Sequence, residues 1–99
     1  MEDVQLKINN SGKGKFTIDA NKEEIAEMVI GTSGDELTVY HTEVAPEWEG
    51  KGLAKKLMAA MVAFAGEHKM KVIPLCPYVH AQFQRHPQEY AAIWKKEEG

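Results

Sequence analysis

The apolar residues of this chain change their spacing once, and this change limits the folds that the chain can adopt. Up to residue 44 they alternate with polar residues, which is typical of half-buried β-strands. Further on they recur every three or four residues, as on one face of a helix, at Leu53, Leu57, Met61 and Phe64. A chain that forms strands first and a covering helix afterwards is predicted to fold as an α+β domain.

Three strands are expected before residue 34. Residues 4–8 and 16–20 alternate on either side of the turn-forming segment NNSGKG, which predicts a hairpin. Residues 22–32 are ambiguous, because their acidic start suits a helix while Ala26 and Met28 continue a strand-like alternation. We favour a strand.

Residues 36–44 predict a fourth strand, because they are rich in β-branched and aromatic side chains. A regular alternation would place His41 on the same face as Leu37 and Val39. Pro46 ends this strand.

The main helix is expected to begin at Leu53 and to end near Gly66, and the apolar segment KVIPL predicts a fifth strand. Two short helical segments should follow, each opened by a proline, Pro77 and Pro87. The expected fold is a mostly antiparallel sheet of about five strands, with a helix after strand four covering one face.

Length and composition indicate one small soluble domain, residues 1–99. Charged residues are 27% and hydrophobic residues 43% of the chain, which is ordinary for a globular protein. Residues 1–47 carry ten acidic and four basic residues, whereas residues 48–99 carry five acidic and eight basic ones, so the second half is the better host for an anion. There is no clustered Lys/Arg stripe, so nucleic acid is not an expected partner.

The cell compartment is expected to be the cytoplasm. The single cysteine cannot form an internal disulfide, and the start MEDVQLKIN has no signal-peptide pattern. The longest apolar run, residues 57–65, is far shorter than the ~20 residues that span a bilayer, so no membrane association is expected. We expect a monomer or a weak dimer.

A glycine turn opens the main helix, in the segment PEWEGKGLAKKL at residues 46–57. The first amides of a helix have no internal partners, and the helix dipole places partial positive charge there. Gly50 and Gly52 allow the backbone to approach a ligand closely, and Lys51, Lys55 and Lys56 add positive charge. A strand, a glycine turn and a helix N-terminus together predict a phosphate site.

Two glycines at this spacing are equally compatible with a turn that needs them for geometry alone. The segment is not a Walker P-loop, which needs four residues between its glycines and then Lys-Ser/Thr. It also lacks the third glycine of a dinucleotide-binding fingerprint.

The segment EWEGKGLAKKL resembles the acetyl-CoA pyrophosphate-binding motif Gln/Arg-x-x-Gly-x-Gly/Ala of the GNAT superfamily of N-acetyltransferases. Together with YHTEV, VIPLCPYV and the later HP, it is similar to a branch of very short, single-domain members of that superfamily. The resemblance covers roughly residues 36–90. Glu47 stands where the superfamily has Gln or Arg, and the chain lacks the two helices that wall the acceptor site in longer members.

The resemblance implies acetyl-CoA as co-substrate and an unidentified amine, possibly on a macromolecule, as acceptor. It implies that the backbone of Glu43 and Val44 pairs with the pantetheine arm, in a notch where strands four and five separate. The residues that it implies around the pyrophosphate are Gly50, Lys51, Gly52, Leu53, Ala54 and Lys55.

Cys76 lies between Pro74 and Pro77, where the fifth strand should end and a helix should begin. As the residue that caps this helix, it would place its sulfur near unpaired amides, which favour the thiolate. Cysteine is also among the most buried residue types, so an inert core thiol is the alternative. We expect a presented thiol, which could carry the acetyl group during transfer.

Two further side chains are candidates for proton transfer. Tyr78 could protonate the departing CoA thiolate, a role that tyrosine often has in the superfamily, or it could pack on the sheet. His41 could act as base for the incoming amine, or be a half-buried structural residue. No metal site is expected, because Cys76 and His80 have no second ligand pair. The alternative function is a non-catalytic acyl-CoA-binding sensor or adaptor.

Overall fold

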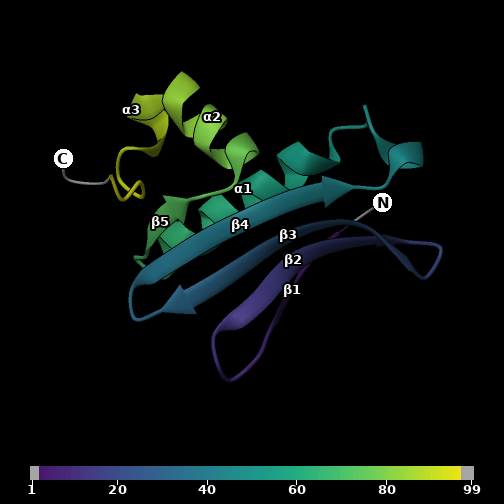
Figure 1. Ribbon diagram of the computed structural model, residues 1–99, viewed down its shortest axis with the longest axis horizontal. Coiled ribbons are helices and arrows are strands. Elements are labelled where there is room, and N and C mark those ends of the chain that lie inside the picture. The colour runs from purple at the N-terminus through teal and green to yellow at the C-terminus, as the bar shows by residue number, and fades with distance from the viewer. Residues whose placement is uncertain (1–2, 97–99) are drawn as a thin grey trace.

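The computed structural model describes residues 3–96, so the two ends of the predicted 1–99 domain lie outside it. It contains a five-stranded sheet in the order β1-β2-β3-β4-β5, with three α-helices (Figure 1). The strands are β1 (Val4–Ile8), β2 (Lys13–Ala20), β3 (Glu23–Ser33), β4 (Glu36–Val44) and β5 (Lys71–Pro74). The helices are a short 3-10 turn η1 (Pro46–Trp48), α1 (Leu53–Glu67), α2 (Pro77–Arg85) and α3 (Pro87–Tyr90). The predicted α+β fold is confirmed, including the strand nature of residues 22–32.

Strands β1 to β4 form antiparallel hairpins, and β5 pairs with β4 in parallel after the crossover through α1. Parallel pairing requires such a crossover, because a tight turn can only reverse the chain. Figure 1 shows α1 running alongside β4, with α2 and α3 grouped near β5 at the C-terminal end of the chain.

The core lies between one face of the sheet and the helices. Cross-strand pairs such as Phe16 with Met28, and Leu37 with Val72, bring the buried residues of successive strands to the same face. On α1 the buried stripe recurs at helical spacing, at Leu53, Leu57, Met61 and Ala65. Burial of these apolar side chains is the main term that stabilises the fold.

A β-bulge in β4 reverses the predicted alternation of its last residues. Val29 pairs with His41 and Ile30 pairs with Val39, which leaves Tyr40 as the extra residue. His41 therefore lies on the face opposite Val39, and the prediction that the two share a face is wrong. The same shift turns Thr42 toward the core side of the sheet, where it pairs with Met28.

Strand β5 pairs along its whole length, but only with the first four residues of β4. The register ends at Val39 with Pro74, and a last hydrogen bond runs from the Cys76 amide to the Val39 carbonyl at 2.8 Å. Pro74 contributes no amide proton to the sheet. The β5 side of β4 is therefore unpaired from residue 40 to residue 44, as the predicted separation of the two strands requires.

None of the helices within residues 3–96 has both the length and the apolar character that crossing a bilayer demands.

Candidate active site

The turn before α1 is held open by two glycines in the left-handed region of backbone space. Gly50 has φ 81° and Gly52, the N-cap residue of α1, has φ 78°. A Cβ atom at either position would meet no atom within 4 Å, so the space beside the turn is open to solvent. Other L-residues rarely adopt this backbone conformation, which explains why glycine occupies both positions.

The amides that follow this turn have no helical acceptors. The first hydrogen bond at the start of α1 runs from the Lys56 amide to the Gly52 carbonyl at 3.1 Å. The amides of Leu53, Ala54 and Lys55 precede it, so helix geometry gives them no internal partner. These amides and the helix dipole alone create a positive potential at the start of α1, before any charged side chain is considered.

A pocket of about 450 Å³ lies beside these amides. It extends from the start of α1 to the end of β4 and to the first turn of α2. We call it the cofactor pocket. Its lining residues are Thr42, Val44, Trp48, Glu49, Gly50, Gly52, Leu53, Ala54, Lys55 and Tyr78.

Of the predicted cofactor-binding residues, two do not line the cofactor pocket: Lys51 of the glycine motif, and Glu43, whose backbone alone was expected to contact the cofactor. The six that line it are Val44, Gly50, Gly52, Leu53, Ala54 and Lys55. The acidic residue in the lining is Glu49, not Glu47. Thr42 was missed by the sequence reasoning because a regular alternation turns it away from the core. Only knowledge of the bulge in β4 would have placed it in the pocket.

Cys76 caps α2 as predicted, but its thiol is buried, with only 2% of the residue exposed. The predicted presentation of the thiol to solvent is wrong. The sulfur lies 3.3 Å from the Thr42 hydroxyl, and no side-chain bond from Cys76 caps the helix amides. Thr42 and Tyr78 line the cofactor pocket, so Cys76 lies directly behind its wall.

Tyr78, in the first turn of α2, lines the pocket from the side opposite the glycine turn. Burial raises the pKa of the Tyr78 phenol, and the nearby Cys76 raises it further. The phenol therefore keeps its proton at neutral pH, the form required of a proton donor.

His41 lies outside the cofactor pocket, on the opposite face of the sheet. Its Nε2 atom is 3.5 Å from a carboxylate oxygen of Glu27 on β3. Burial alone would raise the pKa of Glu27, but its hydrogen bonds with Lys15, Glu24 and His41 and the positive charge of Lys15 outweigh it, so that the pKa is lowered. His41 thus belongs to a charged network on the exposed face.

This network brings one ligand-type atom each of Glu27, His41 and Glu43 within 4.8 Å of one another. Lys15 already contacts the Glu27 carboxylate at 3.3 Å and neutralises part of its charge. Two of the three residues are exposed, and exposed carboxylates commonly gather without a metal. We therefore interpret the cluster as an ion-pair network.

Comparisons with known proteins agree with the fold. The family model of GCN5-related N-acetyl-transferases matches residues 15–93. The chain is similar to the solution structure of a GCN5-like putative N-acetyltransferase from Staphylococcus aureus, with 27% identity and a TM-score of 0.69. That similarity covers 99% of this chain and 94% of the other. No curated protein sequence matches the chain.

Longer enzymes share the fold alone. The ribosomal-protein-alanine N-acetyltransferase from Brucella melitensis has 16% identity and a TM-score of 0.63, over 91% of this chain and 67% of that one. The ribosomal-protein-S18-alanine N-acetyltransferase from Escherichia coli has 16% identity and a TM-score of 0.61. There the similarity covers 67% of this chain and only 43% of the enzyme.

Proposed function

Because the chain belongs to the GCN5-related N-acetyltransferase family, we propose that it binds acetyl-CoA in the cofactor pocket and transfers the acetyl group to a primary amine. One observation carries this proposal. The open glycine turn and the unpartnered amides of α1 adjoin a pocket that continues to the unpaired end of β4. A ligand with an anionic group at one end and an extended amide-bearing arm fits that arrangement.

The pyrophosphate would lie at the start of α1, with the amides of Leu53, Ala54 and Lys55 as donors. Helix N-termini bind phosphate through such amides and through the dipole. The Lys55 side chain adds a positive charge to the pocket lining, while Glu49 opposes it. Lys51, which lies outside the lining, would act only through longer-range attraction.

The pantetheine arm would lie along the end of β4. Since β5 pairs with β4 only as far as Val39, those backbone groups around Glu43 and Val44 that point away from β3 remain available on that side. An extended ligand with amide groups can bind there as an added strand does. This placement would direct the thioester toward Thr42 and Tyr78.

Transfer would proceed by direct attack. The amine nitrogen forms a bond to the thioester carbonyl carbon, and the carbon–sulfur bond then breaks. The backbone amide of Val44 would stabilise the negative charge on the carbonyl oxygen. Tyr78 would give its proton to the departing CoA sulfur, for which its raised pKa suits it.

The amine must lose a proton, and His41 is a candidate base only for an amine that approaches from the exposed face of the sheet. Its neighbour Glu27 would stabilise the protonated imidazole at 3.5 Å. A route through an acetyl group on Cys76 is less favoured, because the thiol is buried behind Thr42. The acetylated cysteine would require the wall of the pocket to open.

The direct test is release of free CoA thiol from acetyl-CoA with a panel of amines, including lysine-containing peptides and small polyamines. Amine-dependent thiol release, with formation of the acetylated amine by mass spectrometry, supports the proposal. Binding of acetyl-CoA without turnover on any amine would instead favour the non-catalytic acyl-CoA-binding role. Absence of binding would contradict both functions.

A further inference from the structure

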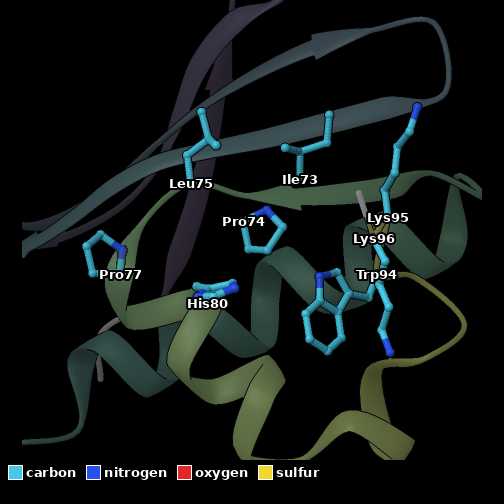
Figure 2. A pocket seen from close by; sticks show the side chains of 8 residues that line it. All are labelled: Ile73, Pro74, Leu75, Pro77, His80, Trp94, Lys95 and Lys96. Atoms are coloured by element: carbon cyan, nitrogen blue, oxygen red, sulfur yellow. The ribbon is translucent and has the colours of Figure 1, made fainter. Parts of the chain in front are cut away.

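A second pocket, of about 510 Å³, lies at the outer edge of β5 (Figure 2). It shares no lining residue with the cofactor pocket. Its volume is within the range of small-molecule sites in proteins. The lining residues are Ile73, Pro74, Leu75, Pro77, His80, Trp94, Lys95 and Lys96.

The backbone of β5 is not open to a further strand at this pocket. On the outer side, Val72 is already bonded to the C-terminal segment, through its amide to Ile93 at 2.6 Å and its carbonyl to Lys95 at 2.9 Å. The next residue that faces this edge is Pro74, which has no amide proton to donate. A ligand in the pocket must therefore be held by side chains.

The side chains form an apolar wall with a defined shape. Trp94 packs against Phe83, with ring centroids 5.5 Å apart. The rings of Trp94 and His80 are nearly perpendicular, and their centroids lie 6.2 Å apart. Leu75, which is 56% exposed, also lines the pocket. Figure 2 shows the Trp94 ring and the His80 ring on the same side of the pocket as Pro74. A flat apolar group fits against this wall.

The charged side chains of the lining are all basic; among its residues in the described chain there is no carboxylate. Lys95 is bonded to the carboxylate of Glu36, whereas the Lys96 ammonium lies 4.7 Å from the centre of the Trp94 ring. Lys96 can leave the ring and pair with an anion at little cost, because such exposed contacts are weak.

We propose that this pocket binds an aromatic carboxylate, with its ring against Trp94 and Pro74 and its carboxylate near Lys96. The chemistry is the same for a free aromatic acid and for a peptide whose last residue is aromatic. The site is separate from acetyl-CoA binding and does not depend on the proposed transfer reaction.

The test is a titration of ¹⁵N-labelled protein with indole-3-acetate. Saturable amide shifts are expected at the non-proline residues of 73–80 and at 94–96, and the affinity should fall in high salt. The neutral analogue 3-methylindole should bind about fivefold more weakly, since it lacks the exposed ion pair. A short peptide ending in tryptophan is titrated in parallel, and whichever of the two acids binds more tightly identifies the source of the ligand. Absence of saturable shifts with both acids would overturn the proposal.

Two variants locate the site. Leu75→Asp places a carboxylate in the lining of the pocket, and its repulsion of the ligand carboxylate should weaken binding of the acid about fivefold. Ile8→Asp is the matched control, because Ile8 is also an exposed apolar residue, 45% exposed, on β1. Lys96→Gln should weaken binding of the acid about fivefold and leave that of 3-methylindole unchanged. Unchanged affinity of indole-3-acetate in both Leu75→Asp and Lys96→Gln would place its site elsewhere and refute the proposal. Acetyl-CoA affinity should be the same in all variants, so the two sites are tested independently.

Discussion

The Thr42 hydroxyl lies 3.3 Å from the Cys76 sulfur, and this contact joins β4 to the N-cap residue of α2 after β5 has separated from β4. It closes the inner wall of the cofactor pocket, because Thr42 lines the pocket while Cys76 is buried behind it. The contact exists because the bulge at Tyr40 turns Thr42 to the core side. A feature of strand pairing therefore places the Thr42 hydroxyl beside the buried thiol.

Cys76 should resist alkylation in the folded protein. Iodoacetamide should modify it at least about tenfold more slowly than in urea, because the reaction requires local opening of a buried site. Cys76→Ala should keep most of the transfer activity and lose about 1–2 kcal/mol of unfolding free energy through the small cavity left. Mass spectrometry and urea unfolding measure the two effects. Rapid modification that acetyl-CoA blocks, with loss of transfer in Cys76→Ala, would support an acetyl-cysteine route instead.

Glu49 should oppose binding of acetyl-CoA because its carboxylate lines the pocket that would hold the phosphates. Glu49→Gln should tighten binding by up to about fivefold, and the gain should shrink in high salt. Glu47→Gln is the matched control, since Glu47 is also exposed but lies outside the lining. Calorimetric titration compares the two. An equal gain in acetyl-CoA affinity in both variants would contradict the placement of the phosphates beside Glu49.

Tyr78→Phe should lower kcat at least about tenfold with little effect on acetyl-CoA affinity, because it removes only the proton donor. The pKa of Tyr78 is raised above the ordinary value of 10.0, so the active, protonated form persists throughout neutral pH and is lost only above that value. The rate should therefore show no Tyr78-dependent decline below pH 10. Tyr90→Phe is the control, because burial also raises the pKa of Tyr90 but the residue lies outside the pocket. A normal rate for Tyr78→Phe would exclude the donor role.

The charged network on the exposed face should make stability depend on pH in acid. The pKa of Glu27 is lowered from its ordinary value of 4.5, so its stabilising effect is present above that value and is lost as the pH falls through the lowered one. Glu27→Gln should lower Tm modestly at pH 7, with a difference from the native protein that disappears in strong acid. Differential scanning calorimetry over this range is the measurement. If Tm of Glu27→Gln were lower by the same amount at all pH values, the variant would have lost packing and not a charge interaction.

The elements of this fold could be predicted because their signals are local. The alternation of apolar residues, the glycines before α1 and the prolines that open α2 and α3 act within a few residues of where they stand. The turn at Gly50 and Gly52 belongs to this class, which is why the lining at the start of α1 could be anticipated.

The faces of the last residues of β4 could not be predicted, because they depend on strand pairing. The bulge at Tyr40 arises from the register of β4 on β3, and no local sequence signal within β4 predicts it. It moved His41 to the exposed face and Thr42 to the pocket. The contact between Thr42 and the sulfur of Cys76, itself part of the buried core, could not be predicted for the same reason.

Titration of acetyl-CoA into the native protein and two glycine variants tests the central claim most directly. Gly52→Asp puts a carboxylate where the pyrophosphate should lie, and Gly34→Asp puts one in the open turn between β3 and β4, where Gly34 also has a positive φ, 59°. Asp tolerates this conformation better than most residues, so both variants should fold, which circular dichroism verifies. The account predicts native affinity for Gly34→Asp and a loss of at least about tenfold for Gly52→Asp. Unchanged affinity in a folded Gly52→Asp protein would contradict it.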